Sequence, residues 1–210
     1  MRKISFVNGE YYHVFNRGVD KRKIFLANYD YERFLYTVKY LLTVGTAQTD
    51  LKLFDQSLAF RGRLSFICYC LMPNHYHLVI QQTRENAISD FMHRLSTSYT
   101  KYFNLNRKRT GRLFENSFKA VHISSEELLL HTTRYIHLNP LLANLTTKLE
   151  TYPWSSYPDY IGMRHDTICA KEQILRLLSE QKQTEVYKNF AADQIDYSKK
   201  LKYIESVLIE

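Results

Sequence analysis

The chain has 210 residues, 45% of them hydrophobic and 24% charged, a composition that suits one folded domain with a small appendage. No apolar run approaches the roughly 20 residues of a membrane span. The first residues lack the apolar core of a signal peptide, so we expect a cytoplasmic protein without a membrane partner. A net charge of +8 favours a polyanionic partner, and 17 Tyr and 12 Phe supply rings on which single-stranded bases can stack.

The first half of the chain predicts three strands and one helix. Alternating aromatic and β-branched residues indicate strands, and Pro73-Asn74 is typical of a tight hairpin turn. Apolar residues at helical spacing follow an N-cap at Asn28 or Asp30. In chain order we expect a strand over Glu10–Arg17, a basic loop over Gly18–Lys23, a helix ending near Leu42, and strands over Leu64–Leu71 and His75–Gln82.

The second half predicts a long helix, a fourth strand and further helices. Ser124-Ser125-Glu126-Glu127 has the acidic character of a helix start. The helix that follows should end near Asn139, because the residue before Pro140 disfavours the α region. We expect helices over Asn86–Asn106 and Leu128–Leu138, a strand over Ser117–Ile123, and helical segments near Lys171–Leu178 and Tyr197–Ile209.

This order of elements is typical of an α+β domain. It predicts a split βαβ (ferredoxin-like) fold, in which one antiparallel sheet has helices packed on one face. We expect residues 1–150 to form this domain and residues 151–210 to form a C-terminal loop and helical extension.

Two histidines at the start of the third strand are the most informative feature of the sequence. His75 and His77 are two residues apart, so on a strand their side chains share one face while Tyr76 points away. Two neutral imidazoles side by side are half of a divalent-metal site.

A third ligand is available on the helix that ends near Asn139. Tyr135 and Asn139 are four residues apart and therefore lie on one helix face. If that face lies over the sheet, Asn139 offers an amide oxygen to an ion held by His75 and His77. This neutral ligand set leaves the charge of the cation for a phosphate, and it suits Mg²⁺ or Mn²⁺.

A tyrosine beside such an ion has a specific use. A phenol with a pKa of about 10 is a weak nucleophile at neutral pH. A Lewis-acid metal on a scissile phosphate makes the phosphorus more electrophilic and stabilises developing charge. The combination predicts a covalent phosphotyrosine link that keeps the bond energy for rejoining strands.

The ordered motifs resemble a known family. M-P-N-H-Y-H-L-V-I, G-R-L-F-E-N-S-F-K-A and R-Y-I-H-L-N-P-L resemble the single-tyrosine HUH transposases, most closely the REP-associated tyrosine transposase branch. The resemblance implies an endonuclease and strand transferase that cuts single-stranded DNA near hairpins through a 5′-phosphotyrosine. It implies that His75 and His77 are the HUH metal ligands, that Tyr135 is the nucleophile, and that Asn139 is a third ligand where many relatives have glutamine. Such proteins act as monomers or homodimers.

Basic residues around the predicted site are candidates for phosphate contacts. They follow the first strand and the long helix: Arg17, Lys21, Arg22, Arg107, Lys108, Arg109 and Arg112. His131 lies one turn before Tyr135 on the same face and is a candidate auxiliary residue for DNA contact or proton transfer.

Two alternatives belong to other classes of protein. A four-stranded sheet rich in aromatic residues also serves non-catalytic binders of single-stranded nucleic acid, although the sequence lacks their defined RNP motif. A zinc-stabilised module could use Cys68, Cys70, His75 and His77, but this spacing does not match the usual zinc fingers.

Overall fold

The computed structural model describes residues 5–43, 60, 62–166 and 168–193. Within these ranges, every helix is too short or too polar to cross a bilayer. The main elements are β1 (Tyr11–Arg17), α1 (Asn28–Thr43), β2 (Leu64–Met72), β3 (His75–Gln82), α2 (Ala87–Asn106), β4 (Lys119–Ile123), α3 (Glu126–Leu142), α4 (Tyr157–Tyr160), α5 (Glu172–Leu178) and α6 (Gln183–Ala192); short 3₁₀ turns lie at Val19–Lys21 and Leu149–Thr151.

The four strands form one antiparallel sheet in the order β2-β3-β1-β4. β1 is central and pairs with β3 from Tyr11↔Gln81 to Arg17↔His75. This register places the end of β1 beside the start of β3. The predicted α+β class and the antiparallel sheet are confirmed.

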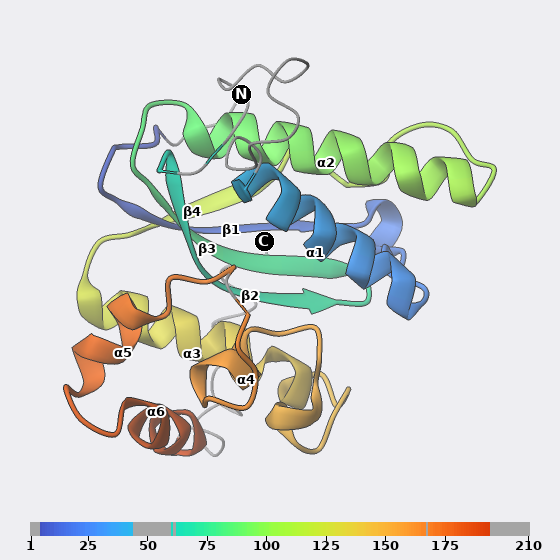
Figure 1. Ribbon diagram of the computed structural model, residues 1–210. Coiled ribbons are helices and arrows are strands. Elements are labelled where there is room, and N and C mark those ends of the chain that lie inside the picture. The colour runs from blue at the N-terminus through green and yellow to red at the C-terminus, as the bar shows by residue number, and fades with distance from the viewer. Residues whose placement is uncertain (1–4, 44–59, 61, 167, 194–210) are drawn as a thin grey trace.

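Helices cover both faces of the sheet (Figure 1). On the first face, α1 and α2 pack on inward-facing residues such as Val14 and Leu78. On the second face, α3 and the helices after it pack on Cys68, Cys70 and Val79. The prediction that helices pack on one face therefore holds for α1 and α2 but is wrong for α3. The reason is that β2 is apolar on both faces, so both need cover.

The end of α3 also differs from the prediction. The helix continues through Pro140 to Leu142 instead of ending near Asn139. Proline removes one backbone donor from the helix. Nearby, the Asn139 side chain donates from Nδ2 to the Tyr135 carbonyl at 2.9 Å, and the Ala143 amide donates to the Asn139 carbonyl. The Ala143 bond continues the helical hydrogen-bond pattern after the proline.

Two segments after α3 complete the comparison with the predicted elements. The pattern near Lys171–Leu178 is α5, as expected, whereas α6 was not predicted. The helix expected over Tyr197–Ile209 lies outside the described residues.

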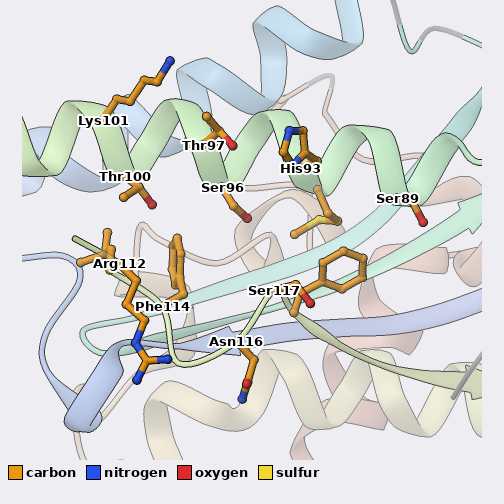
Figure 2. Close-up of a pocket in the computed structure, with 13 residues that line it drawn as sticks. Ser89, His93, Ser96, Thr97, Thr100, Lys101, Arg112, Phe114, Asn116 and Ser117 are labelled. Atoms are coloured by element: carbon orange, nitrogen blue, oxygen red, sulfur yellow. The ribbon is translucent and has the colours of Figure 1, made fainter. Parts of the chain in front are cut away.

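A groove of about 440 Å³ lies between α2 and the chain that leads into β4 (Figure 2). Side chains of α2 from Ser89 to Lys101 form one wall, and residues 112–118 form the other. This groove opens on the side of the sheet that α1 and α2 cover.

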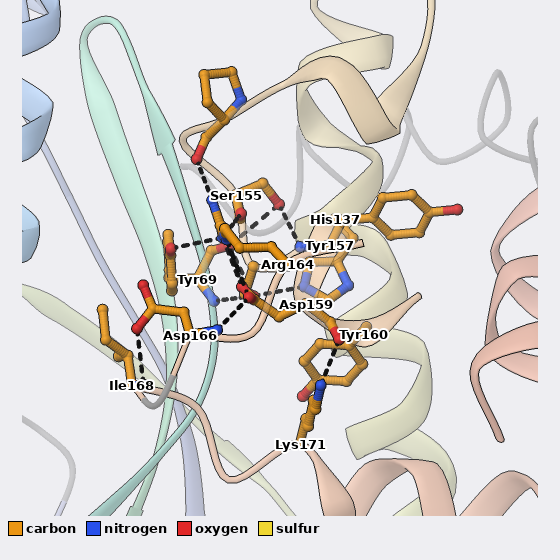
Figure 3. A network of polar contacts seen from close by, with 12 residues as sticks. Tyr69, His137, Ser155, Tyr157, Asp159, Tyr160, Arg164, Asp166, Ile168 and Lys171 are labelled. Carbon is orange, nitrogen blue, oxygen red and sulfur yellow. Dashed lines mark hydrogen bonds and ion pairs between the residues drawn. The ribbon is translucent and has the colours of Figure 1, made fainter. Parts of the chain in front are cut away.

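The C-terminal extension is fixed to the edge strand β2. The Leu71 amide donates to the Trp154 carbonyl, and the Ser156 amide donates to the Tyr69 carbonyl. Arg164 holds this segment by donating to the Ser155 carbonyl and to the carboxylate of buried Asp159 (Figure 3). Residues 154–156 therefore pair with β2 through an isolated antiparallel bridge, Cys70↔Ser155, and cover this part of its edge.

Candidate metal and nucleophile site

His75 and His77 begin β3 directly after the Pro73-Asn74 turn, and their rings lie 4.9 Å apart, nearly perpendicular. Tyr76 between them is buried in the core on the opposite face, as strand alternation predicts. His77 is buried and His75 is partly exposed. Both imidazoles therefore lie on the face that α3 covers.

Each of the two rings is held by a hydrogen bond at Nδ1. His75 Nδ1 donates to Asn74 Oδ1 at 2.6 Å, and His77 Nδ1 lies 2.9 Å from Nε2 of His13 on β1. A neutral imidazole that carries its proton on Nδ1 has its lone pair on Nε2. His77 Nε2 is buried and has no hydrogen-bond partner. The Nε2 atoms are thus the ones left for a ligand.

The three histidines are neutral at physiological pH. Burial lowers the pKa of His13 to about 4, and burial with the Arg17 charge lowers the pKa of His75 to about 4. Burial, followed by the charges of His75 and His13, lowers the pKa of His77 well below its usual value. Neutral imidazole is the form that binds a metal ion.

Tyr135 lies beside this pair. Its ring packs edge-on against His77 with 6.1 Å between centroids, and its side chain is partly exposed. Asn139, one turn later, is buried, and its Nδ2 is used by the Tyr135 carbonyl. Asn139 makes no hydrogen bond to either histidine, so the structure shows Tyr135 in contact with the histidine pair and shows no such contact for Asn139.

The donor set suits a hard divalent cation that keeps several water or phosphate ligands. The buried, unpartnered Nε2 of His77 is the observation that fits a metal. Within the described residues, no group of three or more His, Cys, Asp or Glu could hold an ion alone. This argues against a zinc module built from Cys68, Cys70 and the two histidines. Both thiols are buried in the core, and burial raises the pKa of Cys68 to about 12.

A cavity of about 100 Å³ adjoins the histidines. Besides His75 and His77, it is lined by side chains that include Arg17, Glu115 and Lys119. Arg17 Nε donates to Glu115 Oε1 at 3.0 Å. Cations at the mouth of this cavity can meet a phosphate bound at the histidines.

The predicted DNA-contact residues divide into two groups. Lys21, Lys108 and Arg112 are exposed, and Arg22 is partly exposed beside Asp20. Arg107 instead forms an ion pair with fully buried Asp30 at 2.8 Å. Arg109 donates to Asn104 Oδ1 and to the Arg112 carbonyl. This geometry indicates structural roles for Arg107 and Arg109.

His131 contacts Arg134 and Phe190. Its Nδ1 lies 2.6 Å from the Arg134 guanidinium, and its ring packs near Phe190 of α6. These contacts turn it toward the C-terminal extension and give it no link to the metal site.

His13 is the site residue that sequence reasoning missed. It has no motif around it, and only the pairing of β1 with β3 brings it next to His77. Strand register depends on long-range pairing, which local sequence does not specify. The one available signal was its spacing: His13 is two residues from both Tyr11 and Phe15, so on a strand all three side chains share one face.

Comparison with known proteins assigns a family to the chain. Residues 7–139 match the family model described as "Transposase IS200 like", which is more than half of the chain. No protein of curated function matches. A REP-associated tyrosine transposase bound to a REP hairpin has a similar structure, with a TM-score of 0.55 and 11% identity, over 80% of this chain and 96% of that one. A Deinococcus radiodurans R1 protein named as a transposase gives a TM-score of 0.40 and 15% identity, over 65% and 95% of the two chains.

Proposed function

Because the chain belongs to the IS200-like transposase family, we propose that it cuts and rejoins single-stranded DNA with Tyr135 as nucleophile. The observation that carries this proposal is the buried Nε2 of His77, which lacks a partner while the ring of Tyr135 packs against it. The large majority of buried side-chain polar atoms in proteins have a hydrogen-bond partner, so the unpartnered Nε2 favours a bound ligand.

In this proposal, His75 and His77 bind Mg²⁺ or Mn²⁺ through their Nε2 atoms, and Asn139 Oδ1 is the candidate third ligand. Such an ion, when bound, supplies Lewis-acid polarisation of the scissile phosphate. Asn74 and His13 hold the two rings by their Nδ1 atoms. When His77 donates its Nδ1 proton to His13, its Nε2 lone pair is available to the ion.

Tyr135 performs the covalent step. Its phenolic oxygen attacks the phosphorus, forming a 5′-phosphotyrosine ester and breaking the bond to the 3′ oxygen. The phenol loses its proton to solvent, and the departing oxygen takes one up as a free 3′-OH. Attack by a 3′-OH on the ester reverses the step and rejoins the DNA, so no hydrolysis is required.

The substrate we propose is DNA with a hairpin next to a single-stranded segment. The similar structure named above holds a REP hairpin. Arg17 and Lys119 at the cavity, with exposed Lys21, Lys108 and Arg112, are our candidates for phosphate contacts. The competing function is non-catalytic binding of single-stranded nucleic acid, which leaves the unpartnered His77 nitrogen without a purpose.

The test uses an end-labelled oligonucleotide that carries a hairpin and a single-stranded extension, with Mg²⁺ or Mn²⁺. We expect a protein–DNA adduct that survives a denaturing gel, vanishes in Tyr135→Phe and persists in the matched control Tyr36→Phe, an exposed tyrosine of α1. An adduct in Tyr135→Phe would make the nucleophile assignment wrong. Binding without any adduct from the native chain would favour the non-catalytic alternative.

A further inference from the structure

The groove between α2 and residues 112–118 has a chemical character that the proposed cleavage step does not use. Its α2 wall repeats at helical spacing, so a single face of the helix lines it. None of its lining residues is acidic. They are Ser89, Met92, His93, Ser96, Thr97, Thr100, Lys101, Arg112, Leu113, Phe114, Asn116, Ser117 and Phe118.

Polar groups line the walls of this groove, and apolar groups form its floor. Figure 2 shows Ser96 and Thr100 pointing from α2 toward the opposite segment, while Lys101 extends away from it. Phe114 and Phe118 are buried in the core beneath. Hydroxyl, amide and guanidinium groups donate to phosphate and sugar oxygens.

The groove meets the histidine cavity at one residue. Asn116 lines both hollows. Its segment is anchored to β1, because Asn16 Nδ2 donates to the Asn116 carbonyl at 3.0 Å and to the Ser117 carbonyl at 2.9 Å. One residue earlier, the Glu115 amide donates to the Arg17 carbonyl, which also ties this segment to β1. Because the histidines lie on the face that α3 covers and the groove on the face that α1 and α2 cover, a ligand that occupies both hollows has to pass Asn116 from one side of the sheet to the other.

We propose that this groove holds the single-stranded DNA that continues from the scissile phosphate. The inference rests on the proposed function and adds the path of the substrate. The volume of about 440 Å³ falls within the range of about 300–1,000 Å³ for ligand sites. The wall from Ser89 to Lys101 extends about 18 Å at a rise of 1.5 Å per residue, which is long enough for several stacked nucleotides at about 3.4 Å each.

The test places a charge in the groove. In the Tyr135→Phe background, which prevents cleavage, Thr100→Glu adds a carboxylate opposite residues 112–118, and Thr100→Gln is the neutral control of equal size. A second pair compares Arg112→Ala with Arg176→Ala, an exposed arginine on α5. The measurement is the Kd for a fluorescent hairpin with a single-stranded extension and for the same hairpin without it, together with thermal melting of each variant.

We expect Thr100→Glu to weaken binding of the extended hairpin by about tenfold or more, because like charges are brought together. Thr100→Gln and the hairpin without an extension should change by less than about twofold, and Arg112→Ala should weaken binding more than Arg176→Ala. Native-like affinity of Thr100→Glu for the extended hairpin, at unchanged melting temperature, would overturn the groove assignment. Equal losses for both hairpins would assign the groove to duplex and also overturn it.

Failure of the proposed function gives a different pattern. If the chain with Tyr135 forms no adduct but its binding depends on Thr100 as described, the groove assignment holds and the catalytic proposal fails. If an adduct forms and binding ignores Thr100, only the groove assignment fails.

Discussion

Two buried histidines show how the same side chain serves two regions of this molecule. His137 on α3 and His77 on β3 are both buried and neutral. His137 has both ring nitrogens occupied, by Tyr187 Oη at 2.6 Å and Ser156 Oγ at 2.7 Å, whereas His77 has only Nδ1 occupied. His137, with both ring nitrogens hydrogen-bonded, joins the C-terminal extension to the domain. His77, with Nε2 unpartnered, lies at the proposed metal site beside Tyr135.

The largest expected effect on adduct formation and Mn²⁺ affinity follows from removing the His77 imidazole. His77→Ala should lower adduct formation and Mn²⁺ affinity by well over about a hundredfold, because loss of a direct ligand exceeds the cost of losing an outer partner. Titration calorimetry with Mn²⁺ alone measures the affinity. Unchanged Mn²⁺ affinity would remove His77 from the ligand set.

His137→Phe should do the reverse and leave Mn²⁺ affinity unchanged. It leaves the buried Tyr187 hydroxyl without its partner, whereas Ser156 Oγ keeps its hydrogen bonds to the Tyr69 backbone. Urea unfolding should therefore show a loss of about 1–3 kcal/mol in the free energy of unfolding, the cost of one unsatisfied buried group. A loss of Mn²⁺ affinity at unchanged stability would contradict the division of roles between the two histidines.

His13→Phe tests whether an outer partner holds His77. We expect Mn²⁺ affinity to fall about 10–100-fold, as is usual for loss of an outer-shell hydrogen bond. His13→Gln, which can still bond to His77 Nδ1, should recover part of the affinity. If both variants bind Mn²⁺ like the native chain, His13 has no positioning role.

Because His137 is buried in its neutral form, the free energy of unfolding should decrease as the pH falls. Burial, with the Arg164 charge, lowers its folded pKa from 6.5 to about 3. The unfolded chain therefore binds the extra proton between these values, so stability is complete above pH 6.5 and falls as the pH drops toward 3. The contribution is about 1.4 kcal/mol per pH unit. His137→Phe should show a shallower fall in urea midpoint across this window, and an identical slope would refute the assignment.

The smallest effect concerns the exposed cations. Lys21→Ala should weaken DNA binding by only a few-fold and reduce the slope of log K against log salt by about 1. Arg107→Ala should instead lower stability, because it leaves the carboxylate of Asp30 buried without its ion pair. Fluorescence anisotropy at several salt concentrations separates these two outcomes.

Periodic local patterns predicted most of the fold. The start of β3 at His75 and the helix cap at Ser125 depend only on neighbouring residues. Both predictions are confirmed in the structure. The cover over both faces of β2 was missed because a continuous apolar run does not say what packs on it. In the site, spacing predicted that His75 and His77 share a face. The neighbour His13, the ion pair of Arg107 with Asp30 and the groove beside α2 all depend on contacts between distant segments.

The segment at residues 154–156 has a consequence for solubility and assembly. β2 is a nine-residue edge strand that is buried along almost its whole length, and an uncovered apolar edge is a template for intermolecular pairing. Proteolytic removal of the chain after Tyr152 should therefore convert the protein into an aggregating species. In the described sheet, β4 has β1 as its sole partner strand. Among the described residues, the β4 edge, where Lys119 and His122 are exposed, is therefore also open to edge-to-edge pairing of two intact copies.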